Sequence, residues 1–142
     1  MFFPNDRESL RRMYMEAWER RQAGLPMEPL QMQIADLVEE HPEYQPLLEK
    51  GEDGVHQEWT PEGGETNPFL HFGMHLAIRE QVATNRPAGI AEVHRRLAAG
   101  HGPHEAEHRM MECLGEALWT AQRNGTAPDE ESYLESLRRL PT

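Results

Sequence analysis

Two histidines and a glutamate are spaced four residues apart within residues 103–119, the stretch with most of the chain's chemically useful side chains. His104, His108 and Glu112 follow one another at this interval. On an α-helix, such residues lie about 40° apart and one turn along the axis. The three side chains would form a short ladder on one face of the helix, where they can share one cation. The spacing therefore predicts a metal site.

A second histidine pair with the same spacing, His71 and His75, occurs earlier in the chain. Both pairs fall on the inward face of an expected helix, and a short connecting helix favours antiparallel packing that brings the four imidazoles together. Neutral imidazole suits zinc, iron, nickel or copper, and burying several imidazoles unpaired is costly. We predict a divalent transition metal, zinc or iron before nickel or copper, bound by His71, His75, His104, His108 and Glu112. The alternative is that each histidine is an ordinary core residue hydrogen-bonded to a carbonyl.

Residues 104–108 read His-Glu-Ala-Glu-His, which satisfies the H-E-x-x-H pattern of zinc peptidases. In that pattern Glu105 would activate a zinc-bound water. The match arises easily by chance in a chain rich in histidine and glutamate. No further histidine follows at the metzincin spacing, and no strand is expected that would hold an extended peptide. A zinc hydrolase is therefore kept only as an alternative.

Apolar residues at intervals of three and four, bounded by prolines, glycines and capping residues, predict the helices that must position these side chains. Six helices are expected to begin near residues 6, 29, 68, 87, 103 and 128, with a short helical turn within residues 43–50. Gly100 is expected to end the fourth helix. The sequence predicts an all-α fold, a helical bundle of four longer helices with two shorter helices packed on it, as one domain over residues 1–142.

Residues 51–67 have no helical period and are predicted to form a long loop. Loops of this length are often functional. Because the loop directly precedes the helix of His71, it is a candidate cover for the metal site. Alternatively, Trp59 anchors the loop on the outside of the helices.

Charge and composition narrow the classes of function. The chain has 142 residues, with 25 acidic against 14 basic side chains and a formal charge of −11. This charge repels phosphate backbones and anionic lipids, so we expect neither nucleic acid nor a membrane as partner. We see no apolar run of membrane-spanning length and no signal peptide, and the single cysteine, Cys113, suits a reducing compartment. A cytoplasmic protein is expected, whose partners are a metal ion and either a second copy of the chain or another protein.

Several segments together resemble a known family: residues 41–44 (HPEY), 61–78, 104–108, 111–116 and 119–125. They are similar to a small bacterial family, domain-of-unknown-function family 1841, over nearly the whole chain. The resemblance implies a small helical protein and brings no established activity. Two classes of function therefore remain: a metal-binding helical protein of unspecified activity, or a non-catalytic structural or protein-interaction module.

Overall fold

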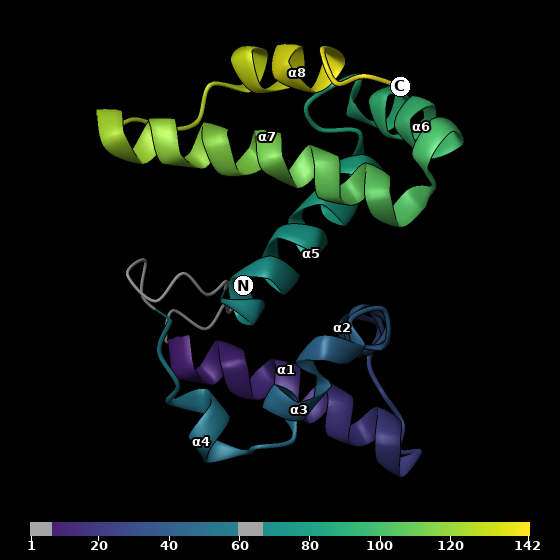
Figure 1. The fold of residues 1–142 in the computed structure, drawn as a ribbon, viewed down its shortest axis with the longest axis vertical. Coiled ribbons are helices and arrows are strands. Elements are labelled where there is room, and N and C mark those ends of the chain that lie inside the picture. The colour runs from purple at the N-terminus through teal and green to yellow at the C-terminus, as the bar shows by residue number, and fades with distance from the viewer. Residues whose placement is uncertain (1–6, 60–66) are drawn as a thin grey trace. The chain divides into compact units, whose positions relative to one another are not determined.

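The chain folds entirely into helices and turns in the part that the computed structural model describes, residues 7–59 and 67–142. These residues form two compact units, unit 1 (Met1–Gly73) and unit 2 (Met74–Thr142), and Figure 1 labels their helices. The all-α prediction is confirmed, whereas the arrangement of four longer and two shorter helices and the single domain stay predictions. Among the described helices, none has the length and apolar content that crossing a membrane requires.

Unit 1 is built on two packed helices, α1 and α2 (Figure 1). Its elements are α1 (Arg7–Ala23), α2 (Pro29–Glu39), the 3₁₀ turn η1 (Pro42–Tyr44), α3 (Gln45–Leu48), α4 (Glu52–Val55) and the first residues of α5 (Pro68–Thr84). The apolar faces of the two main helices are buried, as the intervals of three and four predicted: Tyr14, Ala17 and Trp18 on α1, and Ile34, Leu37 and Val38 on α2.

The prediction of a loop over residues 51–67 is wrong for its first residues, because Glu52–Val55 form the one-turn helix α4. Gly51 adopts φ +66°, which glycine tolerates, and two acidic residues in the first turn favour a helix N-terminus. The buried Arg11 guanidinium donates to the carbonyls of Val55 at 2.8 Å and Gln57 at 2.7 Å, which satisfies acceptors at the helix end. Residues 60–66 of the expected loop lie outside the described residues.

Trp59 is held against neighbouring side chains of unit 1. Its ring packs edge-on against Phe69 with 5.9 Å between the ring centroids. The guanidinium of Arg11 lies 5.1 Å from the centre of the Trp59 ring, within the range of a cation–π contact. These contacts favour the anchoring role of Trp59, while a covering role of the segment stays a prediction.

Unit 2 packs its helices around a core of its own. It contains the rest of α5 together with α6 (Ile90–His101), α7 (Pro103–Asn124) and α8 (Glu130–Arg138). The buried residues that form this core include Ile78, Ile90, Leu97, Met110, Leu114, Tyr133 and Leu137. Gly100 does not end α6 as predicted: the helix continues to His101 and ends at Gly102, whose φ of +86° disfavours any residue with a side chain.

Three helix starts follow the predicted prolines, whereas α6 begins at Ile90, after Gly89 with φ +107°, and not at Pro87 as predicted. Pro29, Pro68 and Pro103 each occupy the first position of a helix, where the missing N–H is no loss. Asn67 Oδ1 accepts a hydrogen bond from the backbone N–H of Phe69 at 2.9 Å. These local signals fix where α5 and α7 begin, and so fix the rotation of the histidines that both helices carry.

Candidate metal centre

His75 of α5 is a buried residue of unit 2 that a glutamate of α7 contacts. Its side chain has no exposed surface, and its Nδ1 lies 2.7 Å from Oε1 of Glu107. Glu107 is also buried, and Arg79 Nε donates to both of its carboxylate oxygens, at 3.1 and 3.0 Å. A hydrogen-bonded chain therefore runs from Arg79 through Glu107 to His75.

The carboxylate of Glu107 is ionised despite its burial. Burial raises the pKa of the Glu107 carboxyl, but the hydrogen bonds from His75 and Arg79 and the charge of Arg79 outweigh it, so its pKa is lowered. An ionised carboxylate only accepts hydrogen bonds, so the proton of the pair sits on Nδ1 of His75. In the neutral ring, Nε2 then carries the lone pair.

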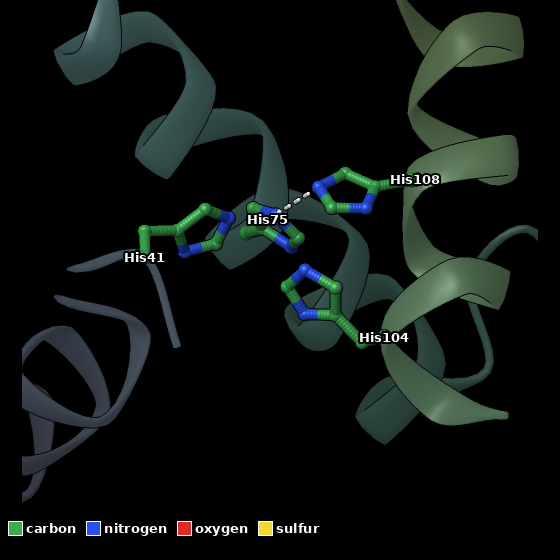
Figure 2. Close-up of side chains that lie close together, drawn as sticks. All are labelled: His41, His75, His104 and His108. Carbon is green, nitrogen blue, oxygen red and sulfur yellow. Dashed lines mark hydrogen bonds between the residues drawn. The ribbon is translucent and has the colours of Figure 1, made fainter. Parts of the chain in front are cut away.

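Three imidazole rings, those of His75, His104 and His108, lie close together. Nε2 of His75 lies 3.1 Å from Nε2 of His108. The ring of His104 stacks on His75 at 5.4 Å and stands edge-on to His108 at 4.3 Å between centroids. Each of the three rings has a nitrogen within 4.8 Å of a nitrogen of the others. Figure 2 shows the side chains of His104 and His108 reaching from α7 toward His75, with the contact from His75 to His108 dashed.

The spacing of these nitrogens fits ligands of one ion. With metal–nitrogen bonds of 2.0–2.1 Å, two imidazole ligands lie about 3.3 Å apart on a tetrahedral ion and about 2.9 Å apart on an octahedral one. The 3.1 Å between the Nε2 atoms of His75 and His108 falls between these values. A hydrogen bond in which His108 Nε2–H donates to His75 Nε2 would have the same length. The spacing alone is therefore compatible with a shared metal ion and with a hydrogen bond.

The structure brings together three of the five predicted ligands. His75, His104 and His108 meet in unit 2. Glu112 is exposed on α7, one turn beyond His108. His71 belongs to unit 1, where its ring faces His41. The roles of His71 and Glu112 as ligands stay predictions.

Glu105, the glutamate of the H-E-x-x-H pattern, lies on the surface. Its carboxylate is 3.3 Å from Nε of Arg109, in an ion pair on the same helix. The glutamate that contacts a histidine is instead Glu107, which the pattern leaves unspecified. Sequence reasoning missed Glu107, Arg79 and His41. A signal for Glu107 was present, because it stands four and seven residues before the buried Met111 and Leu114 and so shares their apolar face.

The fold and this cluster define an all-helical protein in which a buried carboxylate orients one member of a group of three histidines. Within that class, the chain belongs to the family described as "Domain of unknown function (DUF1841)", whose model matches residues 6–139. The family predicted from the sequence is thus confirmed. No curated protein and no solved structure matches the chain.

Proposed function

We propose that this protein binds a divalent transition metal, zinc or iron, through His75, His104 and His108. The observation that carries the proposal is the hydrogen bond of 2.7 Å between buried Glu107 and His75 Nδ1. Histidine ligands of metals almost always donate their second ring nitrogen to such a carboxylate or to a carbonyl, which fixes the tautomer and raises the basicity of the ligating atom. Glu107 does this for His75, and Arg79 holds Glu107 in turn.

The donor set favours metals that prefer nitrogen ligands. Three neutral imidazoles suit zinc, iron, nickel or copper, whereas calcium and magnesium require oxygen ligands. Three protein ligands leave at least one position of a four-coordinate ion for water, substrate or a further side chain. Glu112, which the sequence nominates and which lies on the same helix, is the first residue to test as a further ligand in unit 2.

Elemental analysis of the purified protein tests the proposal, with His75→Ala and His108→Ala as variants. We expect the parent to retain zinc or iron after dialysis and each variant to lose most of it, because each removes a ligand. The matched control is His94→Ala, a half-buried histidine of α6 in the same unit, which should leave the metal content unchanged. A parent that takes up no metal from a titrated solution, or variants that bind it as tightly, would refute the proposal.

The hydrolase alternative has less support from the same geometry. A general base must lie within hydrogen-bond reach of the water that it activates. Glu105 is exposed and paired with Arg109, and Glu107 has its oxygens engaged by His75 and Arg79. A zinc-loaded protein without peptidase activity is therefore the expected result.

A pair of exposed apolar side chains favours the alternative that the chain is a protein-interaction module. Leu118 and Trp119 are neighbours on α7 with 45% and 59% of their surfaces exposed, and the guanidinium of Arg123 lies 5.3 Å from the Trp119 ring centre. Exposed large apolar side chains of this kind occur at protein contacts. If the chain self-associates through them, light scattering should give a mass above one chain that falls to the monomer in Trp119→Ser.

A further inference from the structure

His41 is a buried histidine two residues after the end of α2, and the geometry of that helix end orients its ring. Pro42 follows and disfavours helical geometry at the residue before it, so the backbone of His41 leaves the helix with φ −129° and ψ 69°. The imidazole folds back, and Nδ1 lies 2.8 Å from the carbonyl oxygen of Leu37. This carbonyl is among the last four of α2, which lack donors from the helix itself. His41 is 2% exposed.

The hydrogen bond to Leu37 fixes the protonation of the His41 ring. A carbonyl only accepts, so Nδ1 of His41 carries the proton, and Nε2 of the neutral ring carries the lone pair. Nε2 of His41 faces Nε2 of His71 on α5 at 3.2 Å. This distance again lies between the separations of about 2.9 and about 3.3 Å expected for two nitrogens on one octahedral or tetrahedral ion.

Aromatic rings hold the two imidazoles in place. The Tyr44 ring stacks on His41 at 5.7 Å and stands edge-on to His71, also at 5.7 Å. Phe72 packs edge-on against His41 at 5.6 Å. Because both rings are packed before any ligand arrives, little side-chain entropy remains to be lost on binding.

We infer that His41 and His71 bind a divalent transition-metal ion through their Nε2 atoms. A backbone carbonyl that holds Nδ1 is the same supporting arrangement that Glu107 supplies to His75, and it is typical of histidines that ligate metals. The inference concerns residues of unit 1 and goes beyond the proposed function, which uses three histidines of unit 2. The competing arrangement is an N–H···N hydrogen bond from His71 to His41 without an ion.

Calorimetric titration of the metal-stripped full chain with zinc tests this inference. His71→Gln and His41→Gln should each weaken zinc binding by more than about tenfold or remove an equivalent of zinc, since even indirect partners of ligands are worth 10–100-fold. The control is His56→Gln, an exposed histidine of unit 1 that pairs with Glu8 and Glu52, and it should bind zinc like the parent.

Imidazole nitrogen NMR of the parent supplies a readout that does not depend on a variant that folds. Before zinc is added, His41 should show the Nδ1–H tautomer. On addition of zinc, the Nε2 resonances of both His41 and His71 should shift, as expected for nitrogens that acquire a metal bond. Unchanged Nε2 resonances under saturating zinc, or folded glutamine variants that titrate like the parent, would overturn the inference.

Failure of this inference can be told apart from failure of the proposed function. Titrations of His75→Ala and of His108→Ala report on unit 2, and titration of His71→Gln reports on the pair in unit 1. If only the two unit 2 variants change zinc binding, the proposed function stands and the inference fails. If only His71→Gln changes zinc binding, the inference stands and the proposed function fails.

Discussion

Replacing Glu107 by Gln is the sharpest test of how the histidine cluster in unit 2 is oriented. Glutamine has nearly the same shape but no charge, and it has one acceptor oxygen where glutamate has two. If that oxygen takes the position of Oε1, it still accepts from His75 Nδ1, which lies 2.7 Å away. The amide NH₂ then takes the place of Oε2 and faces Arg79 Nε at 3.0 Å, donor against donor, and only the hydrogen bond of 3.1 Å from Arg79 Nε to the Oε1 position remains.

Two effects of known size follow from this substitution. Loss of the carboxylate partner of a ligating histidine lowers metal affinity by about 10–100-fold, which corresponds to about 1.4–2.7 kcal/mol. In the metal-free protein, the frustrated contact with Arg79 should reduce the free energy of unfolding by about 1–3 kcal/mol. The substitution should therefore lower both quantities.

The assay compares zinc affinity by competition with a chelating dye and stability by urea unfolding of the metal-free protein. The matched control is Glu105→Gln on the same helix, where an exposed carboxylate pairs with Arg109. An exposed ion pair contributes at most about 1 kcal/mol, so this control should change stability little and affinity not at all. A Glu107→Gln variant that loses stability but binds zinc as tightly as the parent would show that Glu107 only supports the fold, and the argument from the tautomer would fail.

Three further predictions concern stability and reactivity. Zinc at a hundred times the dissociation constant of the site in unit 2 should raise the free energy of unfolding by about 2.7 kcal/mol and a chelator should reverse this, whereas His75→Ala should remove the part of the effect that this site supplies. The hydrogen bonds from the side chain and backbone of Ser132 lower the pKa of the Asp129 carboxyl, which caps α8. A lowered pKa in the folded state means that this carboxylate stabilises the fold at neutral pH and that the stabilisation is lost as the pH falls below about 4. The free energy of unfolding of Asp129→Ala should therefore decrease less than that of the parent as the pH falls through this range. Burial raises the pKa of the Cys113 thiol, so a thiol reagent should label it slowly in the folded protein and quickly in urea.

Helix positions were predictable because the signals that set them are local. A proline at the first turn, an asparagine or aspartate just before it and a glycine after the last turn each act over a few residues, so the sequence alone predicts where α2, α5 and α7 begin. The one-turn helix α4 was missed because four residues are too few for an apolar period. It is held by Arg11, more than forty residues away in sequence.

The paired histidines were predictable, whereas His41 and the supporting residues Glu107 and Arg79 were not. Pairs at four-residue spacing stand out in a sequence, whereas His41 is single, lies outside any helix and is oriented by the proline that follows it. Its contacts with Leu37 and His71 depend on tertiary structure. Arg79 was missed for the same reason, because its link to Glu107 joins residues 28 apart in sequence.

Glu107 could have been distinguished from Glu105 by the directions in which the two side chains leave the helix. At about 100° per residue, Glu107 lies between the directions of Met111 and Leu114, and Glu105 lies on the other side of His108. A carboxylate in an apolar stripe must be paired, because burying it alone is costly. Its nearest partner on a neighbouring helix is a histidine, which then presents its other nitrogen to the remaining imidazoles. The directions of these residues on the helix therefore favour the proposed metal binding over peptide hydrolysis, because the buried Glu107 orients His75 and the exposed Glu105 faces Arg109.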